Sequence, residues 1–264
     1  MNVLVTGAAS GIGRAVVKHF AERGFTVYGI DVKNPGEGEN FIGFTVDVTD
    51  SESLMTVSDS LAENNIAFEA IVCVAGIHAM ASLVEDSYEK IKRVIDVNLL
   101  GAMAVCRTFY KNLKPSGRIV IVTSEVATYD PMPFNGLYNV SKTALDSYAQ
   151  ALRQELNLLG QRVVTVRPGA VETPLANASG RATEELAVRT ELYHTQAKHF
   201  CNLVAKFTGK PMHPGRVAAL IYKAATAKRT RLDYSINRHP GLVLLSILPR
   251  RLQCVVIKML LGRK

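Results

Sequence analysis

The feature that most constrains this fold is a repeated alternation of short apolar runs with helical patterns. The apolar runs lie at 3–5, 26–30, 41–46, 70–74, 118–122 and 163–166, with a further strand-like run at 232–236. Helical spacing is found at 12–23, from about 50 to 64, from about 88 to 113, at 138–159 and from about 183 to 206. The first six runs are apolar throughout, which indicates burial on both faces, as in a parallel sheet. Strand–helix alternation therefore predicts an α/β fold, a doubly wound parallel sheet with helices on both faces, in a single domain over 1–264.

Composition argues against several other classes of protein. Hydrophobic residues make up 48% of the chain, enough for a large core. The four cysteines, Cys73, Cys106, Cys201 and Cys254, form no CxxC pair and lie among apolar neighbours. This pattern predicts buried, reduced thiols, and neither a disulfide framework nor a metal site. We see no signal peptide and no clean membrane-spanning run, so we expect a cytoplasmic protein.

The positive charge is concentrated at the C-terminal end. Residues 201–264 hold 13 Lys or Arg and one acid, Asp233, whereas the whole chain has a net charge of +8. The final segment, about 249–261, has the pattern of a basic amphipathic helix. Its apolar face would consist of Leu252, Val255, Val256, Met259 and Leu260. Such a helix could lie on an anionic membrane surface, pack on the body or contact another subunit. No nucleic-acid-binding motif accompanies the charge, so we do not expect nucleic acid as a partner.

A glycine-rich turn follows the first strand and opens the first helix. In VTGAASGIGRA the three glycines would let a tight turn bring backbone N–H groups and a helix N-terminus towards one point, which favours a phosphate. We assign a dinucleotide-binding role to Gly7, Ser10, Gly11, Ile12 and Gly13. Asp31 ends the second strand, where its carboxylate would accept hydrogen bonds from ribose hydroxyls and repel a 2′-phosphate. NAD is therefore the expected cofactor, with NADP less favoured.

The TGxxxGxG pattern of the turn and the Tyr-x-x-x-Lys pair at Tyr138 and Lys142 resemble those of the short-chain dehydrogenase/reductase family. The resemblance is strong over about 1–175 and implies a Rossmann-like fold. It also implies an oxidoreductase that transfers a hydride between NAD(H) and a secondary alcohol or ketone. In this family Tyr138, Lys142, Ser124 and Asn98 would be the catalytic residues.

Helical spacing places Tyr138 and Lys142 on one face, and a tyrosine is too weak an acid to act as a base unaided at neutral pH. We expect the neighbouring ammonium and a cationic nicotinamide ring to favour the phenolate. The resemblance implies that Lys142 also binds the nicotinamide ribose and that Asn98 supports Lys142 through a water. Ser124 would bind the reacting oxygen, although it precedes the tyrosine by one residue more than is usual. Glu125, at the usual spacing, is a possible substrate contact.

The resemblance implies further cofactor contacts along the chain. These are Asp47, Val48, Ala75, Gly76, Pro168, Gly169, Val171 and Thr173, in addition to Asn98, Tyr138 and Lys142. Asp47 would contact the adenine, and Thr173 would bind the carboxamide. One departure is Cys73-Val74 in place of the family's usual Asn-Asn, which removes the asparagine bonds that brace the central strand.

Residues 174–213 occupy the position of the family's substrate lid. Six apolar residues there could line a lipophilic pocket for a steroid or long-chain substrate: Leu175, Leu186, Leu192, Tyr193, Phe200 and Leu203. The resemblance also implies a homodimer or homotetramer formed through the helices near 88–113 and 138–159. Two alternatives stay open at this point: an NADPH-dependent ketone reductase, and a non-catalytic dinucleotide-binding sensor or scaffold of the same fold.

Overall fold

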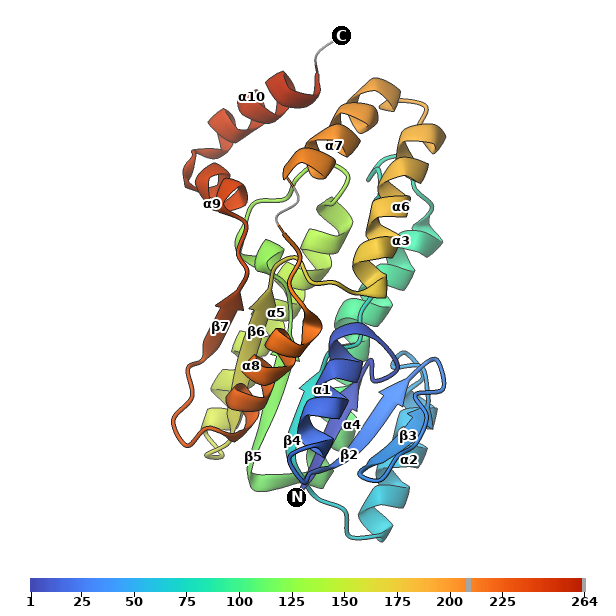
Figure 1. The fold of residues 1–264 in the computed structure, drawn as a ribbon, viewed down its shortest axis with the longest axis vertical. Helices are drawn as coiled ribbons and strands as arrows, with labels where there is room; N and C mark the ends of the chain where they lie inside the picture. Colours follow the sequence, from blue (N-terminus) through green and yellow to red (C-terminus); the bar gives the residue numbers. More distant parts are fainter. Residues whose placement is uncertain (208–209, 263–264) are drawn as a thin grey trace.

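The chain forms one twisted sheet of seven parallel strands, shown in Figure 1. The structure is a computed structural model that describes residues 1–207 and 210–262. The strands are β1 Asn2–Thr6, β2 Thr26–Asp31, β3 Phe41–Thr45, β4 Phe68–Cys73, β5 Leu113–Val122, β6 Arg162–Pro168 and β7 Asp233–Ile236. They lie in the order β3-β2-β1-β4-β5-β6-β7, and Val5 of β1 sits beside Gly29 of β2 and Val72 of β4. The predicted fold class is thus confirmed.

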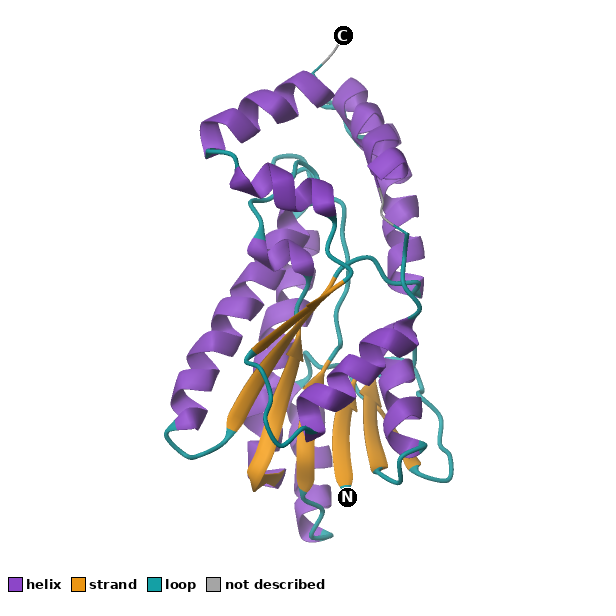
Figure 2. Cartoon of the chain, turned by 60° about the vertical axis from the view of Figure 1, so that its left-hand side comes forward, coloured by secondary structure: helices purple, strands orange, loops and turns teal. Residues whose placement is uncertain are grey.

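Helices cover both faces of this sheet, as Figures 1 and 2 show. They are α1 Gly11–Ala21, α2 Ser51–Glu63, α3 Tyr88–Ile95, α4 Gly101–Phe109, α5 Gly136–Asn157, α6 Pro174–Arg189, α7 His194–Phe207, α8 Pro214–Thr226, α9 Pro240–Ile247 and α10 Arg250–Leu261. Each face of the sheet packs against its own hydrophobic core, and alternate residues of β1 point into the two cores. Val3 and Val5 pack with α1 and α8, whereas Leu4 faces the opposite core with α2, α4 and α5. The non-alternating apolar strands therefore serve two buried faces.

A third, smaller core lies beyond the carboxyl ends of the strands. It joins Met80 and Phe134 to Leu186 of α6, Phe200 of α7 and Leu261 of α10. Within the described residues, no helix is long and apolar enough to span a membrane. The predicted lid at 174–213 corresponds largely to α6 and α7, and its residues 208 and 209 lie outside the described part.

The predicted helix at 88–113 is wrong in its continuity and its end. A π-helical turn over Asp96–Leu100 separates α3 from α4, and α4 stops at Phe109. Leu113 already belongs to β5, because Pro115 cannot continue a helix. The π turn carries Asn98, and π turns inside helices are frequent at functional sites.

The predicted helix at about 183–206 is two helices. It begins nine residues early, at Pro174, and breaks after Arg189. The break has a tertiary cause: Glu85 accepts hydrogen bonds from the Thr190 hydroxyl and from the backbone N–H groups of Glu191 and Leu192. Helices α8 and α9 were not predicted from the sequence.

The prediction of four buried thiols is only half right. Cys73 and Cys106 are buried, with their sulfur atoms 3.7 Å apart, but Cys201 is half-buried and Cys254 is exposed on α10.

Candidate active site

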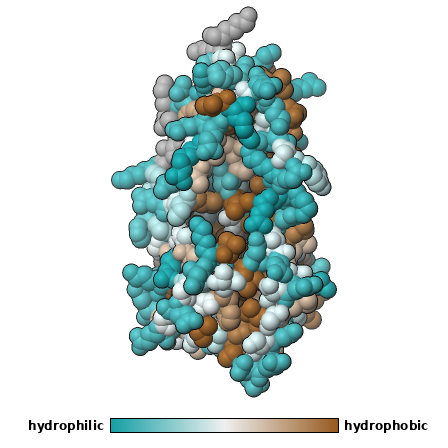
Figure 3. Space-filling model, turned by 90° about the vertical axis from the view of Figure 1, so that its right-hand side faces the viewer, coloured by the Kyte–Doolittle hydropathy of each residue, from teal (hydrophilic) through white to brown (hydrophobic). Residues whose placement is uncertain are grey.

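A groove opens where β1 and β4 meet, the point at which the order of the strands reverses. Ligands of doubly wound sheets bind at such a point, outside the carboxyl ends of the strands. The groove is lined by many of the predicted cofactor residues: Gly7, Ser10, Gly11, Ile12, Gly13, Asp31, Asp47, Val48, Ala75, Gly76 and Thr173. Figure 3 shows the side of the molecule on which α3 and α6 lie in Figure 1, with apolar side chains gathered along its hollowed middle.

The glycine-rich turn has the geometry that a phosphate needs. Gly7 and Gly11 have positive φ, +70° and +52°, and a side chain on Gly13 would meet the Gly7 carbonyl oxygen at 1.9 Å. Ser10 precedes α1 but gives it no side-chain cap. The N–H groups of the first turn of α1 therefore lack a side-chain acceptor, and an anion would supply one. These residues fit the pyrophosphate of a dinucleotide.

Two carboxylates, those of Asp31 and Asp47, line the cofactor groove. Asp31 is held by backbone N–H groups, with Oδ2 accepting from Ala9 and Oδ1 from Lys33, each at 2.9 Å. Asp47 pairs with Arg93, which sequence reasoning missed, at 3.0 Å. Burial alone would raise the pKa of Asp47, but hydrogen bonds from Thr49 and Arg93 hold it below its ordinary value.

The central strand is braced even without the family's usual asparagine pair. The Thr6 hydroxyl oxygen accepts hydrogen bonds from the N–H groups of Val74 and Ala75, both at 3.1 Å. Beyond them, a side chain on Gly76 would come within 3.1 Å of Asn98 Oδ1 and 3.3 Å of Lys142 Nζ. Thr6 thus holds the chain at the end of β4, as the family's asparagines would. Gly76 leaves the space in front of Lys142 open because it has no side chain.

A second cavity continues from the groove and contains the predicted catalytic hydroxyls and amine. Its lining includes Ser124 at the end of β5 and Tyr138 and Lys142 on α5. Gly76, Val74 and Thr173 line both spaces, and the predicted residues Pro168, Gly169 and Val171 line this second one. We call it the reaction cavity. Lys142 Nζ lies 5.9 Å from the centre of the Tyr138 ring, and Ser124 is close enough to the Tyr138 hydroxyl to influence its pKa.

Burial controls the charge of this pair. It raises the pKa of Tyr138 to about 12, although the hydrogen bond from Ser124 acts in the opposite direction. It lowers the pKa of Lys142 to about 8. Desolvation therefore outweighs the effect of the lysine on the phenol, and the expectation that lysine and nicotinamide ring together favour the phenolate stays a prediction.

Asn98 lies behind the reaction cavity and is fully buried. Its Oδ1 accepts from the Ile77 N–H at 2.7 Å, and its Nδ2 donates to the Ile77 carbonyl and to Ser141 Oγ, each at 2.9 Å. These bonds connect the π turn to the end of β4 and to α5. Asn98 thus fixes the position of the helix that carries Tyr138 and Lys142.

His78 is a site residue that sequence reasoning missed. Its ring lies 4.4 Å from the Tyr138 ring, centre to centre, and its Nε2 is 3.0 Å from Asn135 Oδ1. Burial lowers the pKa of His78 to about 4, so the ring is neutral at neutral pH. Its one sequence signal was its place two residues after Gly76, at the carboxyl end of a strand.

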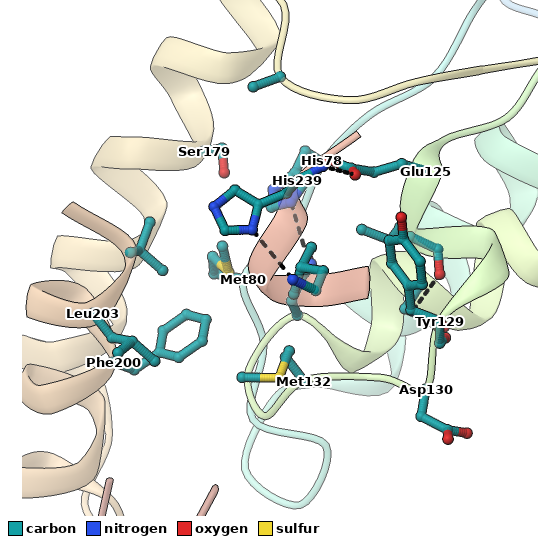
Figure 4. Close-up of a pocket in the computed structure, with 16 residues that line it drawn as sticks. His78, Met80, Glu125, Tyr129, Asp130, Met132, Ser179, Phe200, Leu203 and His239 are labelled. Carbon is teal, nitrogen blue, oxygen red and sulfur yellow. Dashed lines mark hydrogen bonds between the residues drawn. The ribbon is translucent and has the colours of Figure 1, made fainter. Parts of the chain in front are cut away.

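A third, largely apolar cavity adjoins the reaction cavity, and Figure 4 shows it in close-up. Met80, Met132, Phe200, Leu203 and Leu242 line it. The two spaces share several lining residues: His78, Glu125, Val126, Asn135, Ala170, Ser179 and Val204. We call this space the apolar cavity.

Only two of the six apolar lid residues predicted to line a pocket do so in the apolar cavity, namely Phe200 and Leu203. Leu175 lines the cofactor groove and the reaction cavity instead. Leu186 is buried in the third core, and Tyr193 packs on the Phe134 ring at 5.6 Å. Leu192 is exposed.

The fold and the site together define a dinucleotide-binding α/β enzyme with a tyrosine–lysine centre. A model of the short chain dehydrogenase family matches residues 1–184, and the chain belongs to that family. It is therefore an NAD(P)-dependent oxidoreductase that transfers a hydride between the cofactor and an alcohol or ketone.

Three relatives carry names that refer to an acyl, sphingosine or steroid compound. NADPH-dependent 1-acyldihydroxyacetone phosphate reductase from Schizosaccharomyces pombe is 30% identical, over 74% of this chain and 69% of its own length. Human 17-beta-hydroxysteroid dehydrogenase type 1 is 27% identical, over 88% of this chain and 76% of its own length. 3-Ketodihydrosphingosine reductase from Bacteroides thetaiotaomicron is 25% identical, over 86% of this chain and 84% of its own length.

The solved structure of a short chain dehydrogenase family protein from Francisella tularensis has a TM-score of 0.74. It is 27% identical, with 89% of this chain and 96% of that chain covered. The chain also resembles part of longer proteins, and spans 34% of the length of a short-chain type dehydrogenase/reductase from Sinorhizobium fredii.

Proposed function

We propose that this protein interconverts a lipophilic secondary alcohol and its ketone with NAD(H) as cofactor. One observation carries the proposal: Tyr138 and Ser124 line the cavity that joins the cofactor groove to an apolar cavity. A hydride donor bound in the groove and an apolar substrate could meet in this cavity.

The chain's own residues would handle the oxygen and the proton. Ser124 would bind the reacting oxygen, and Tyr138 Oη would give it a proton in reduction or take one in oxidation. Lys142 would keep a positive charge beside the phenol, and Asn98 would hold α5 in place. A nicotinamide bound in the groove supplies or accepts the hydride.

The preference for NAD rests on Asp31. Its carboxylate is fixed by Ala9 and Lys33 at the end of the groove, where a ribose hydroxyl could donate to it and a 2′-phosphate would be repelled. Lys33 also lines the groove, which is the one feature that favours the alternative, an NADPH-dependent reductase.

The preference for a lipophilic substrate rests on the apolar cavity. Side chains of Met80, Met132, Phe200 and Leu203 offer no hydrogen bond, so an alkyl or ring system would gain free energy by burial there. The names of the lipid- and steroid-directed relatives support the same substrate class. Residues 174–213 would form the lid that closes over this substrate.

We further propose peripheral contact with an anionic membrane and self-association. Helices α9 and α10 expose Leu244, Ile247, Val255 and Met259 beside basic residues, as an interfacial helix does. Leu100, at the end of the π turn before α4, and Val140 on α5 are exposed and could meet a second copy. A cytoplasmic location stays a prediction.

Titration with NADH and NADPH, followed by nicotinamide fluorescence, tests the cofactor proposal. We expect NADH to bind more tightly, and Asp31→Ser to reduce the difference by weakening the discrimination against the 2′-phosphate. Leu192→Ser, an exposed change away from the groove, is the control. Tighter NADPH binding by the unmodified protein would favour the reductase alternative, and binding without turnover of any secondary alcohol would favour a sensor.

A further inference from the structure

Glu125 is a buried carboxylate placed directly beside the proposed chemistry. It follows Ser124 at the end of β5, begins the short helix Glu125–Thr128, and is only 7% exposed. Its side chain lines both the reaction cavity and the apolar cavity. A substrate that extends from one cavity into the other would have this carboxylate among its neighbours.

One carboxylate oxygen of Glu125 accepts a hydrogen bond from the backbone, and the other accepts none from the described residues. Oε2 accepts a hydrogen bond from the backbone N–H of His239, just before α9, at 2.7 Å, as Figure 4 shows. Oε1 has no hydrogen-bond partner among the described residues, and it lies 2.8 Å from where a side-chain carbon at Gly169 would be. The same carbon would lie 1.9 Å from the Asn237 carbonyl oxygen, so the close approach of the Asn237 backbone requires glycine at this position.

The charge of Glu125 is compensated only in part. Burial raises its pKa, while the His239 N–H and the nearby Arg238 act in the other direction. No ion pair to Glu125 is formed within the described residues. Asp130, which lines the same apolar cavity, is by contrast bonded to both Arg250 and Gln253. A carboxylate oxygen that lines a cavity and has no donor among the described residues favours a ligand that brings one.

We propose that Glu125 binds a second polar group of the substrate, an amino or hydroxyl group on the carbon next to the reacting one. This inference rests on the proposed function and specifies its substrate class: long-chain vicinal amino alcohols or diols and the matching ketones. Ser124 would hold the reacting oxygen and the neighbouring Glu125 the adjacent donor, while the alkyl chain occupies the apolar cavity.

Three probes of equal chain length test this assignment: dodecan-2-ol, dodecane-1,2-diol and 1-aminododecan-2-ol. Binding to the protein with NADH is measured by calorimetry, and oxidation is measured with NAD. We expect the diol or the amino alcohol to bind about tenfold to a hundredfold more tightly than the simple alcohol, in line with a hydrogen bond to a charged group. A preference for the amine over the diol would identify an ammonium ligand, and the reverse a hydroxyl.

Glu125→Gln should remove most of that preference and leave binding of dodecan-2-ol nearly unchanged, because glutamine still accepts from the His239 N–H. Glu172→Gln, at an exposed glutamate that lines neither cavity, is the matched control. Equal binding of all three probes by the unmodified protein would overturn the assignment without any variant. Selective binding with no oxidation of any probe would retain the Glu125 site and count against the proposed reaction instead.

Discussion

Burial acts on Tyr138 and Lys142 in the same sense, towards the neutral form of each side chain. Desolvation favours the neutral form of each, which raises the tyrosine pKa to about 12 and lowers the lysine pKa to about 8. At neutral pH the phenol keeps its proton and the lysine is largely charged. The isolated site is therefore set to donate a proton to a ketone, and oxidation needs a further positive charge near the phenol.

Ketone reduction should depend on the charge of Lys142. We expect kcat/KM for reduction to be level below about pH 8 and to fall above it, as the lysine loses its proton. Tyr138 stays protonated throughout this range, so it does not cause the fall. A pH profile with saturating NADH measures this, and Lys142→Arg, if it retains activity, should move the fall to higher pH. A descending limb at the same pH in that variant would assign it to another group.

At the residue scale, the sequence was informative where local geometry dictates the residue type. Gly7, Gly11 and Gly13 were predictable because a tight turn and close packing admit no side chain there. His78 and Glu125 could not be assigned this way. Glu125 accepts a hydrogen bond from the N–H of His239, which is 114 positions away in the chain.

At the scale of elements, ion pairs connect the helix of the site to the sheet, and the one nearest Ser124 joins Asp146 to Arg167. Asp146 on α5 accepts from Arg167 of β6 at 2.8 and 2.7 Å and from the Thr123 hydroxyl, next to Ser124, at 3.1 Å. The same arginine also lies 3.2 Å from Asp233 of β7. This contact fixes α5, and with it Tyr138 and Lys142, relative to the serine.

Asp146→Asn should destabilise the protein by about 2 kcal/mol, because it removes a charge-assisted, largely buried pair. It should also lower kcat more than the affinity for NADH. Urea unfolding and steady-state kinetics measure the two effects. Asp59→Asn, in an exposed pair with Lys111, is the control and should cost less than about 1 kcal/mol. Equal losses in the two variants would contradict a positioning role for Asp146.

Helix boundaries were harder to predict than helix existence, for physical reasons. The break after Arg189 is caused by Glu85, which is distant in sequence, and no local signal marks it. The π turn at Asp96–Leu100 accompanies the long-range bonds of Asn98. Tertiary contacts thus overrode helical periodicity in both places.

At the scale of the whole molecule, apolar and basic groups gather at the end opposite the N-terminus, where α9 and α10 lie in Figure 1. Leu244 and Ile247 of α9 are 68% and 73% exposed. Leu242, on the same helix, lines the apolar cavity. A membrane held at this end would be close to the space proposed for a lipophilic substrate.

The protein should co-sediment with vesicles that contain phosphatidylserine, and less with neutral vesicles. Replacing Leu244 and Ile247 together by Gln should reduce this binding severalfold, since two exposed apolar side chains no longer enter the interface. The matched control replaces Leu158 and Leu159, exposed at the end of α5, by Gln. Equal sedimentation of both double variants would exclude α9 as the contact.

The most direct test of the central claim is the turnover of Tyr138→Phe. Phenylalanine keeps the ring against His78 and removes only the hydroxyl that would carry the proton. We predict that oxidation of a long-chain secondary alcohol with NAD falls at least about a hundredfold, the usual contribution of a general acid–base group, while NADH affinity is unchanged. Turnover close to that of the unmodified protein would contradict the claim that this hydroxyl performs the proton transfer.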